Sequence, residues 1–242
     1  MKSISSLAVF VAVVLAFAPA AAAEIRSNPK AVVELFTSQG CSSCPKADAK
    51  FAELGTRQDV IALAWHVDYW DYIGWPDTFG TAENSDRQRA YAESWGSSRI
   101  YTPQLIVNGL KGVVGSRDKE VEAALTEAAL PLPVQLELKG DMLKVSVAPQ
   151  GGTGAAIVWL VTYKDRAAVD IERGENAGKT IDYTQIVTGK QMLGMWEGAE
   201  GTVLKLPLSE LSANGSNGAV ILVQSDKDGL PGPILGAASI LL

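Results

Sequence analysis

Cys41 and Cys44 are the only cysteines in this chain of 242 residues, and only Ser42 and Ser43 separate them. An apolar run, residues 31–36, comes before the pair, and a helix-compatible stretch from Pro45 follows it. The first turn of a helix has unpaired N–H groups and a partial positive charge, which favour a thiolate. A thiolate is the nucleophile of thiol–disulfide exchange, so the context predicts a redox-active pair.

Three alternative roles for the two cysteines stay open. A structural disulfide across so short a loop contributes only about 2 kcal/mol in the chain-entropy model. A zinc site normally has four ligands, whereas the chain offers two cysteines and one histidine. Two inert buried thiols would suit an apolar setting better than the Gly- and Ser-rich surroundings of this pair.

His66 is the single histidine, near the end of an apolar run at residues 60–67. Sites gather at the carboxyl edge of open α/β sheets. His66 is therefore a candidate general base, or a third ligand with Cys41 and Cys44 in a copper site. We favour the simpler interpretation, a core histidine hydrogen-bonded to Asp68 or to a backbone carbonyl.

Residues 65–75 carry five aromatic side chains, among them Tyr69 and Trp70. We expect a loop over residues 68–80 that packs on the body as a lid. The alternative is an apolar wall that holds an extended polypeptide substrate, with Tyr69 and Trp70 as contacts.

The N-terminus has the pattern of a signal peptide. Lys2 supplies a positive charge, residues 7–17 are almost wholly apolar, and small residues end at Ala23. We expect cleavage after Ala23 and export to the bacterial periplasm or beyond, where disulfides persist. The apolar stretch is short for a membrane span, so we expect no membrane insertion of the mature chain.

Composition limits the partners. Residues 1–23 contain only one charged side chain, Lys2, and the rest of the chain has a net charge of −7 at pH 7. This charge argues against nucleic acids and anionic membranes. The chain is 47% hydrophobic, enough for a packed core. No cofactor is implied, and the expected partner is a thiol- or disulfide-containing protein or a small thiol.

The hydrophobic pattern divides the chain into three parts: a signal peptide at 1–23, a first domain at 24–130 and a second at 131–242. The first domain is predicted to have strands at 31–37, 60–67, 104–107 and 112–114, and helices at 44–56, 82–95 and 117–130. After Pro131 the pattern changes to alternating strands and turns, which predicts a small antiparallel β-sandwich or Greek-key domain with no chemistry of its own.

The order of elements in residues 31–130, with the Cys-Ser-Ser-Cys pair at the start of a helix, resembles the thioredoxin fold. The segment Tyr101-Thr-Pro-Gln-Leu-Ile-Val-Asn-Gly109 is similar to the thioredoxin and glutaredoxin segment in which a cis-proline faces the disulfide. Three longer phrases, at residues 34–45, 64–72 and 173–176, resemble a secreted bacterial family known as a domain of unknown function. The resemblance covers nearly the whole chain after the signal peptide and implies a thioredoxin-like α/β domain followed by a small all-β domain.

The resemblance also implies roles for individual residues. Cys41 matches the attacking cysteine, nearer to solvent, and Cys44 the resolving one. Pro103 matches the cis-proline, whose neighbour Thr102 offers its backbone to an extended substrate. Glu34 matches a buried acid below the disulfide that shuttles a proton. It lies seven residues before Cys41 instead of six, which can turn its side chain to the other face of the strand.

The expected function is therefore an exported thiol–disulfide oxidoreductase. Its direction is not implied, because Ser42 and Ser43 match neither the Gly-Pro of reductants nor the Pro-His of strong oxidants. Two alternatives stay open: a non-enzymatic thioredoxin-fold binding module with a static disulfide, and a copper-handling protein that uses both cysteines and His66.

Overall fold

The computed structural model describes residues 23–152 and 154–242. The expected signal peptide lies outside these residues, apart from Ala23. Twelve strands are formed in the described chain: β1 (Glu24–Ser27), β2 (Ala31–Thr37), β3 (Val60–His66), β4 (Gln104–Val107), β5 (Lys111–Val114), β6 (Val134–Lys139), β7 (Met142–Val147), β8 (Ala156–Ile171), β9 (Lys179–Trp196), β10 (Thr202–Pro207), β11 (Gly218–Lys227) and β12 (Leu230–Leu241). The helices are α1 (Pro45–Gly55), α2 (Ala82–Ser94), α3 (Asp118–Glu127) and α4 (Leu208–Leu211), with 3₁₀ turns η1 (Asp71–Ile73) and η2 (Ala213–Gly215).

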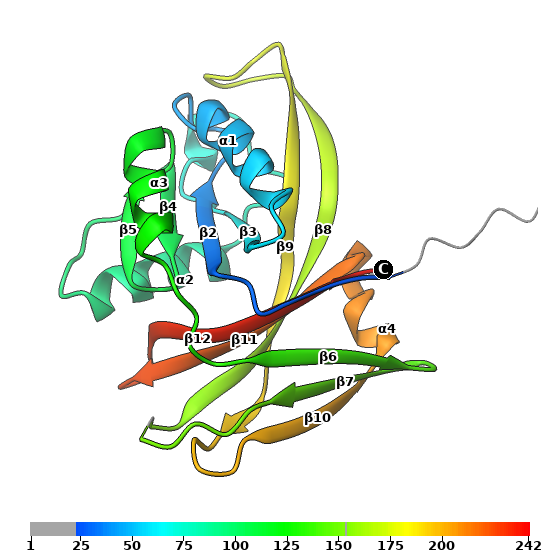
Figure 1. The fold of residues 1–242 in the computed structure, drawn as a ribbon. Helices are drawn as coiled ribbons and strands as arrows, with labels where there is room; N and C mark the ends of the chain where they lie inside the picture. Colours follow the sequence, from blue (N-terminus) through cyan, green and yellow to red (C-terminus); the bar gives the residue numbers. More distant parts are fainter. Residues whose placement is uncertain (1–22, 153) are drawn as a thin grey trace, which may run out of the picture.

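Nine of these strands form one mixed sheet, in the order β1-β12-β11-β8-β9-β3-β2-β4-β5. Strands β2 and β3 are parallel, and β3 is joined to β9 by a parallel pairing of Ala64 with Ile186. A separate three-stranded sheet has the order β10-β7-β6. In Figure 1 the helices α1, α2 and α3 gather around β2–β5, and the three-stranded sheet lies at the other end of the molecule.

The expected fold class, a thioredoxin-like α/β domain followed by a small all-β domain, is wrong. Strands from both halves of the chain share the nine-stranded sheet, the chain is mostly β, and its helices are few. The physical reason is the length of β8 and β9, which form a hairpin of 16- and 18-residue strands. Strands of this length extend beyond the other strands of the second half of the chain, and β9 reaches the edge of β3. The backbone groups at that edge would otherwise lack partners. The division of the chain near residue 130 stays a prediction.

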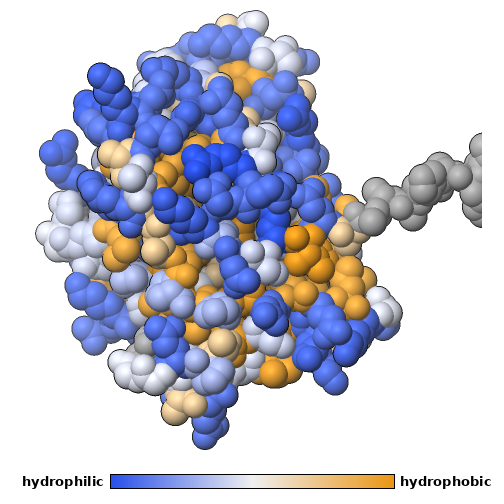
Figure 2. Space-filling view, in the orientation of Figure 1, coloured by the Kyte–Doolittle hydropathy of each residue, from blue (hydrophilic) through white to orange (hydrophobic). Residues whose placement is uncertain are grey.

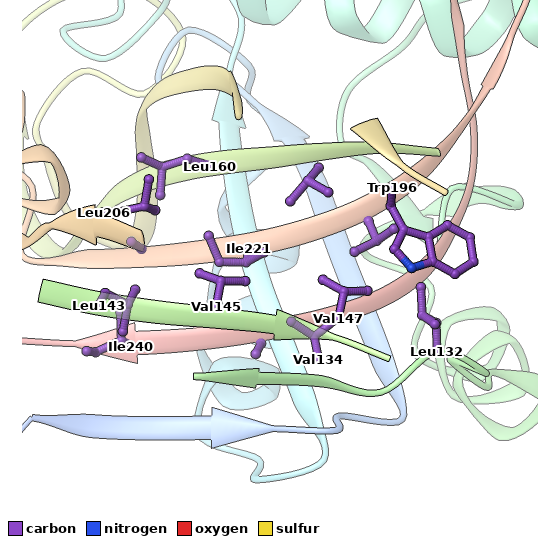
Figure 3. Close-up of a cluster of buried hydrophobic side chains, with 14 of the residues drawn as sticks. Leu132, Val134, Leu143, Val145, Val147, Leu160, Trp196, Leu206, Ile221 and Ile240 are labelled. Atoms are coloured by element: carbon purple, nitrogen blue, oxygen red, sulfur yellow. The ribbon is translucent and has the colours of Figure 1, made fainter. Parts of the chain in front are cut away.

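Three clusters of apolar side chains hold the layers together. One lies between β2–β5 and the helices α1 and α3, and includes Phe51, Leu54 and Val121. A second lies on the opposite face of β2 and β3, where α2 and strands β8, β9, β11 and β12 close it. A third lies between the two sheets around Trp196, as Figure 3 shows. The face in Figure 2 is mostly hydrophilic over the helices, with apolar patches toward the strands at the other end.

Candidate functional site

Cys41 and Cys44 form a disulfide directly before α1. Cys44 is the N-cap of the helix, and Pro45 takes the first helical position, where a missing N–H costs nothing. The preceding turn is closed by the N–H of Cys41, which donates to the carbonyl of Ser38 at 3.1 Å. The sequence therefore places both sulfurs at the positive end of α1, as the Cys-Ser-Ser-Cys spacing predicts.

The two cysteines are buried, with 1% of Cys41 and none of Cys44 exposed, while Ser42 and Ser43 lie at the surface. Cys41 is expected to be nearer to solvent than Cys44, but in this oxidised structure both cysteines are buried and only the two serines between them are exposed. The hydroxyl of Ser43 lies 3.4 Å from Sγ of Cys41. In the reduced protein this hydroxyl can donate to a Cys41 thiolate and lower its pKa.

Asp48 lies one helical turn after Cys44, and its N–H donates to the Cys44 carbonyl at 3.0 Å. Residues four apart share a helix face, so this side chain lies on the same face of α1 as Cys44. Thr37 donates to Oδ1 of Asp48 at 2.7 Å, while Oδ2 has no partner among the described residues. Burial raises the pKa of Asp48 to about 7, against the opposing effects of the Thr37 hydrogen bond and His66.

His66 is fully buried, and its Nδ1 lies 2.8 Å from Oδ2 of Asp77. Burial lowers the pKa of His66, but the charge and hydrogen bond of Asp77, together with the charge of Asp48, outweigh it and raise the pKa. Nε2 of His66 and the hydroxyl of Tyr183 have no partner among the described residues, and the two rings lie 4.8 Å apart. His66 is thus a core histidine, as expected, but its partner is Asp77 and not Asp68.

Thr102 and Pro103 are joined by a cis peptide bond, which confirms the geometry that the resemblance implies. The carbonyl of Pro103 accepts from the N–H of Gly115 at 3.0 Å. A Cβ at Gly115 would lie 3.2 Å from Cβ of Ala47, so Gly115 packs closely against the first turn of α1. Gly115 therefore lies between the carbonyl of Pro103 and the first turn of the helix that follows the disulfide.

The loop over residues 68–80, called here the aromatic loop, contacts both the Thr102–Pro103 segment and the turn before Cys41. Trp70 donates from Nε1 to the Thr102 hydroxyl at 2.7 Å. A Cβ on Gly40, the residue before Cys41, would lie 3.1 Å from Cβ of Trp70. Trp70 therefore contacts the segments on both sides of the disulfide. Tyr72 stacks on Trp70 and is 80% exposed, whereas Tyr69 is turned inward and donates to Oε1 of Gln88.

The tip of the β8–β9 hairpin covers the cysteine turn. Fully buried Asn176 donates from Nδ2 to the carbonyls of Gln39 and Cys41, at 2.9 and 3.0 Å. Lys179 donates in turn to Oδ1 of Asn176. Figure 1 shows this tip reaching past α1 from the far strands. The segment around Asn176 was part of the family resemblance, but sequence reasoning gave it no role, because its contact lies 135 residues away.

Glu34 is not part of the site, and its expected role below the disulfide is wrong. Its carboxylate accepts from Nε and Nη2 of Arg87 at 2.8 and 2.7 Å and from the hydroxyl of Tyr91. Side chains alternate along a strand. Leu35 and Thr37 of β2 face α1, so Glu34 faces α2 on the opposite side of the sheet. The extra residue between Glu34 and Cys41 accounts for the difference, and the buried acid on the α1 side of β2 is Asp48, which accepts from Thr37.

The copper alternative finds no ligand set. Across residues 23–152 and 154–242, no three His, Cys, Asp or Glu side chains are grouped so as to hold a metal ion. His66 uses Nδ1 for Asp77, which leaves only Nε2 free. In the same part of the chain, no helix has the length and apolar character needed to cross a bilayer.

Fold and site together define a mixed β-sheet protein with a disulfide at a helix N-terminus. The chain belongs to the family described as Protein of unknown function (DUF1223), whose model matches residues 32–224. It is similar to the crystal structure of protein AGR_C_4864 from Agrobacterium tumefaciens. The two are 35% identical with a TM-score of 0.79, over 89% of this chain and 95% of the other. No curated protein matches the chain.

Proposed function

We propose that the protein is an exported thiol–disulfide oxidoreductase whose Cys41–Cys44 pair exchanges with a protein or small-thiol partner. The observation that carries the proposal is the position of Asp48. A buried carboxyl group with a pKa of about 7 lies one helical turn after Cys44, in the helix that begins at the disulfide. A proton donor and acceptor poised near neutral pH is what a departing or attacking cysteine needs.

The exchange has two steps in the oxidising direction. A substrate thiolate attacks Sγ of Cys41, the Cys41–Cys44 bond breaks, and Cys44 leaves as a thiolate that takes the proton of Asp48. A second substrate thiolate then attacks the substrate sulfur of the mixed disulfide, which forms the substrate disulfide and releases Cys41 as a thiolate. The substrate loses two electrons and the protein gains them. In the reducing direction the same steps run backward, and Asp48 accepts the proton of Cys44.

Two segments are suited to hold a substrate next to Cys41. Pro103 is joined through Gly115 to the first turn of α1, and Trp70 links Thr102 to the cysteine turn. Trp70, with exposed Tyr72 stacked on it, offers an aromatic surface to an extended polypeptide. The hydroxyl of Tyr69 does not face the substrate in this arrangement, because it donates to Gln88.

A second candidate function is a binding module with a static disulfide. The observation in its favour is burial, since Cys41 is only 1% exposed and Asn176 fixes its carbonyl. Exchange by the first mechanism therefore needs the hairpin tip or the aromatic loop to move away from Cys41.

The reduction potential distinguishes the two functions. The protein is equilibrated with glutathione or dithiothreitol buffers, and free thiols are trapped by alkylation. Exchange predicts a potential above about −270 mV, because the helix N-terminus and Ser43 stabilise a Cys41 thiolate. A Cys44→Ser variant should also trap glutathione on Cys41. A potential below about −300 mV, with no trapped adduct, would support the static disulfide.

Export is part of the same proposal. Strand β1 begins at Glu24, the residue after the expected cleavage site, and pairs with β12. Cleavage at Ala23 would thus leave the sheet intact. An oxidising compartment would supply the thiol and disulfide partners that the exchange requires.

A further inference from the structure

A large groove lies away from the disulfide, between α2, β8, β9 and the ends of β11 and β12. Its volume is about 970 Å³, at the upper end of the range for small-molecule sites. Trp65 of β3 lines it, whereas the next residue, His66, faces the disulfide side. Because successive strand side chains alternate, the groove and the disulfide lie on opposite faces of the sheet.

One wall of the groove is apolar and continues onto the surface. Ile157 and Trp159 of β8 line it. In the β8–β9 ladder Trp159 pairs with Met192, and Ile157 pairs with Met195. Directly paired residues in an antiparallel ladder share a face. The two methionines are 49% and 45% exposed, so they extend the apolar wall with adaptable side chains of the kind found on binding surfaces.

The same wall carries a cation without a carboxylate partner. Nζ of Lys190 lies 3.7 Å from the ring centroid of Trp159 and makes no ion pair or hydrogen bond with any described residue. The neighbouring cation, Arg87, is already paired with Glu34. Desolvation and the charge of Arg87 lower the pKa of Lys190 to about 8, against the smaller effect of Glu34. Glu34 thus acts on both Arg87 and Lys190 but is paired only with Arg87. A bound anion would compensate the positive charge of Lys190.

The acidic residues that line the groove do not supply this balance. Glu83 and Asp86 are exposed on α2, and Asp86 is paired with Arg89. Asp226 is exposed near the end of β11. The groove therefore combines apolar aromatic and aliphatic walls with the cation of Lys190 on the Trp159 ring, and its acidic residues are exposed. These features together favour a ligand with an apolar body and one negative group.

We propose that this groove binds an amphipathic organic carboxylate. The carboxylate pairs with Lys190, and the apolar chain or ring packs against Trp159, Ile157 and the adjoining methionines. This site is separate from the disulfide and does not depend on thiol exchange.

Binding is tested by titrating the oxidised protein, residues 24–242, with decanoate, decan-1-ol and decylamine, using calorimetry and tryptophan fluorescence. Decanoate should bind with 1:1 stoichiometry and more tightly than the alcohol, while decylamine should bind weakest. Lys190→Met should weaken decanoate binding about 10-fold or more and leave the alcohol unchanged, because it removes only a charge-assisted contact.

The controls separate charge from fold. Lys190→Arg should keep decanoate binding, and Lys119→Gln, on α3 far from the groove, should change nothing. Lys190 is exposed, so its variants should unfold at the wild-type temperature. A Cys41→Ser, Cys44→Ser variant should bind decanoate normally, which distinguishes this site from the proposed exchange. The proposal is overturned if decanoate binds no better than decan-1-ol, or if Lys190→Met leaves its affinity unchanged.

Discussion

Asp48 is a buried carboxyl group whose Oδ2 atom has no hydrogen-bond partner among the described residues. A buried charge without full pairing is costly, and this is the reason its pKa rises toward neutrality. The sequence did contain a signal for this residue. Asp48 comes four residues after Cys44 and between Ala47 and Phe51, which places an acid on the buried face of the helix. The resemblance to thioredoxins instead predicts Glu34 as the proton-shuttling acid, because in that family the acid comes before the cysteines.

Asp48→Asn tests the energetic consequence. The pKa of Asp48 is about 7 in the folded protein, against its ordinary value of 3.8, so the folded state binds more protons between these pH values. The stability that this group contributes is therefore present below about pH 4 and is lost as the pH rises through 7. A shift of this size corresponds to about 4 kcal/mol. Urea unfolding should show that Asp48→Asn is more stable than the wild type at pH 8 and nearly equal at pH 4.

The same variant should slow the chemistry. Without a carboxyl group, the proton of Cys44 has no nearby acceptor, so release of a glutathione adduct from Cys41 should slow at neutral pH by about 10²-fold. Asp141→Asn, an exposed hairpin residue, is the matched control and should change neither stability nor rate. Equal release rates for Asp48→Asn and the wild type would remove Asp48 from the mechanism.

His66→Ala separates a structural from a metal-binding role. Asp77 would keep the N–H donors of Gln39 and Phe79 but lose the imidazole, so the variant should be less stable by about 1–3 kcal/mol. Chemical denaturation measures this loss. Cu(I) titration of the reduced proteins is the companion measurement. Stoichiometric copper in the wild type that disappears in His66→Ala would contradict the assignment of His66 to the core.

At the scale of elements, the local pattern of the first half gave correct strands and helices. The strand predicted at 31–37 is β2, the strand at 104–107 is β4, and the helix at 82–95 is α2 within one residue. The two strands are short continuous apolar runs, and the helix has a recognisable start at Thr81, which caps α2. The β8–β9 hairpin was harder to predict, because register shifts after Val158 and Thr162 interrupt its alternation.

The tip of that hairpin provides an element-scale prediction. Asn176→Ala removes the two hydrogen bonds that hold the cysteine turn under the tip, so Cys41 should become more accessible. In the reduced protein, alkylation of Cys41 by iodoacetamide should be at least about 10-fold faster than in the wild type, with Cys44 still protected. Mass spectrometry of timed samples measures both rates.

Asn217→Ala is the control, because Asn217 also bonds to a backbone N–H, at Asp165, far from the cysteines. It should leave the alkylation of Cys41 unchanged. If Asn176→Ala has no effect either, the tip does not limit access, and the aromatic loop becomes the segment that must move.

At the scale of the whole molecule, the pairing of β3 with β9 joins strands from the two halves of the chain into one sheet. The residues of β3, from Val60 to His66, are all buried, which indicates that both faces of the strand are covered. The sequence shows that β3 is buried but not which strand lies beside it. One pairing, Ala64 with Ile186, spans 122 residues, and no local pattern encodes a contact of that separation. The fold class could therefore not be obtained from periodicity alone.

From this pairing we expect that the first half of the chain does not fold alone. The apolar cluster around Phe36, Trp65 and Tyr91 is completed by side chains of later strands, among them Val161, Val187, Val220, Leu222 and Ile234. A fragment of residues 24–130 would expose this face and leave the edge of β3 unpaired. We expect it to bind a hydrophobic dye, to lack a cooperative unfolding transition and to lose protection of its cysteines.

The matched control is the chain 24–242, which should unfold cooperatively and protect Cys44. Mixing the fragment with residues 131–242 should restore protection if the two parts can find the β3–β9 edge. A sharp urea transition in the fragment alone, with dispersed amide signals, would show that β2–β5 and α1–α3 are an independent unit. In that case the nine-stranded sheet would arise by docking of two folded parts, and the cover of the disulfide by Asn176 would be an interdomain contact.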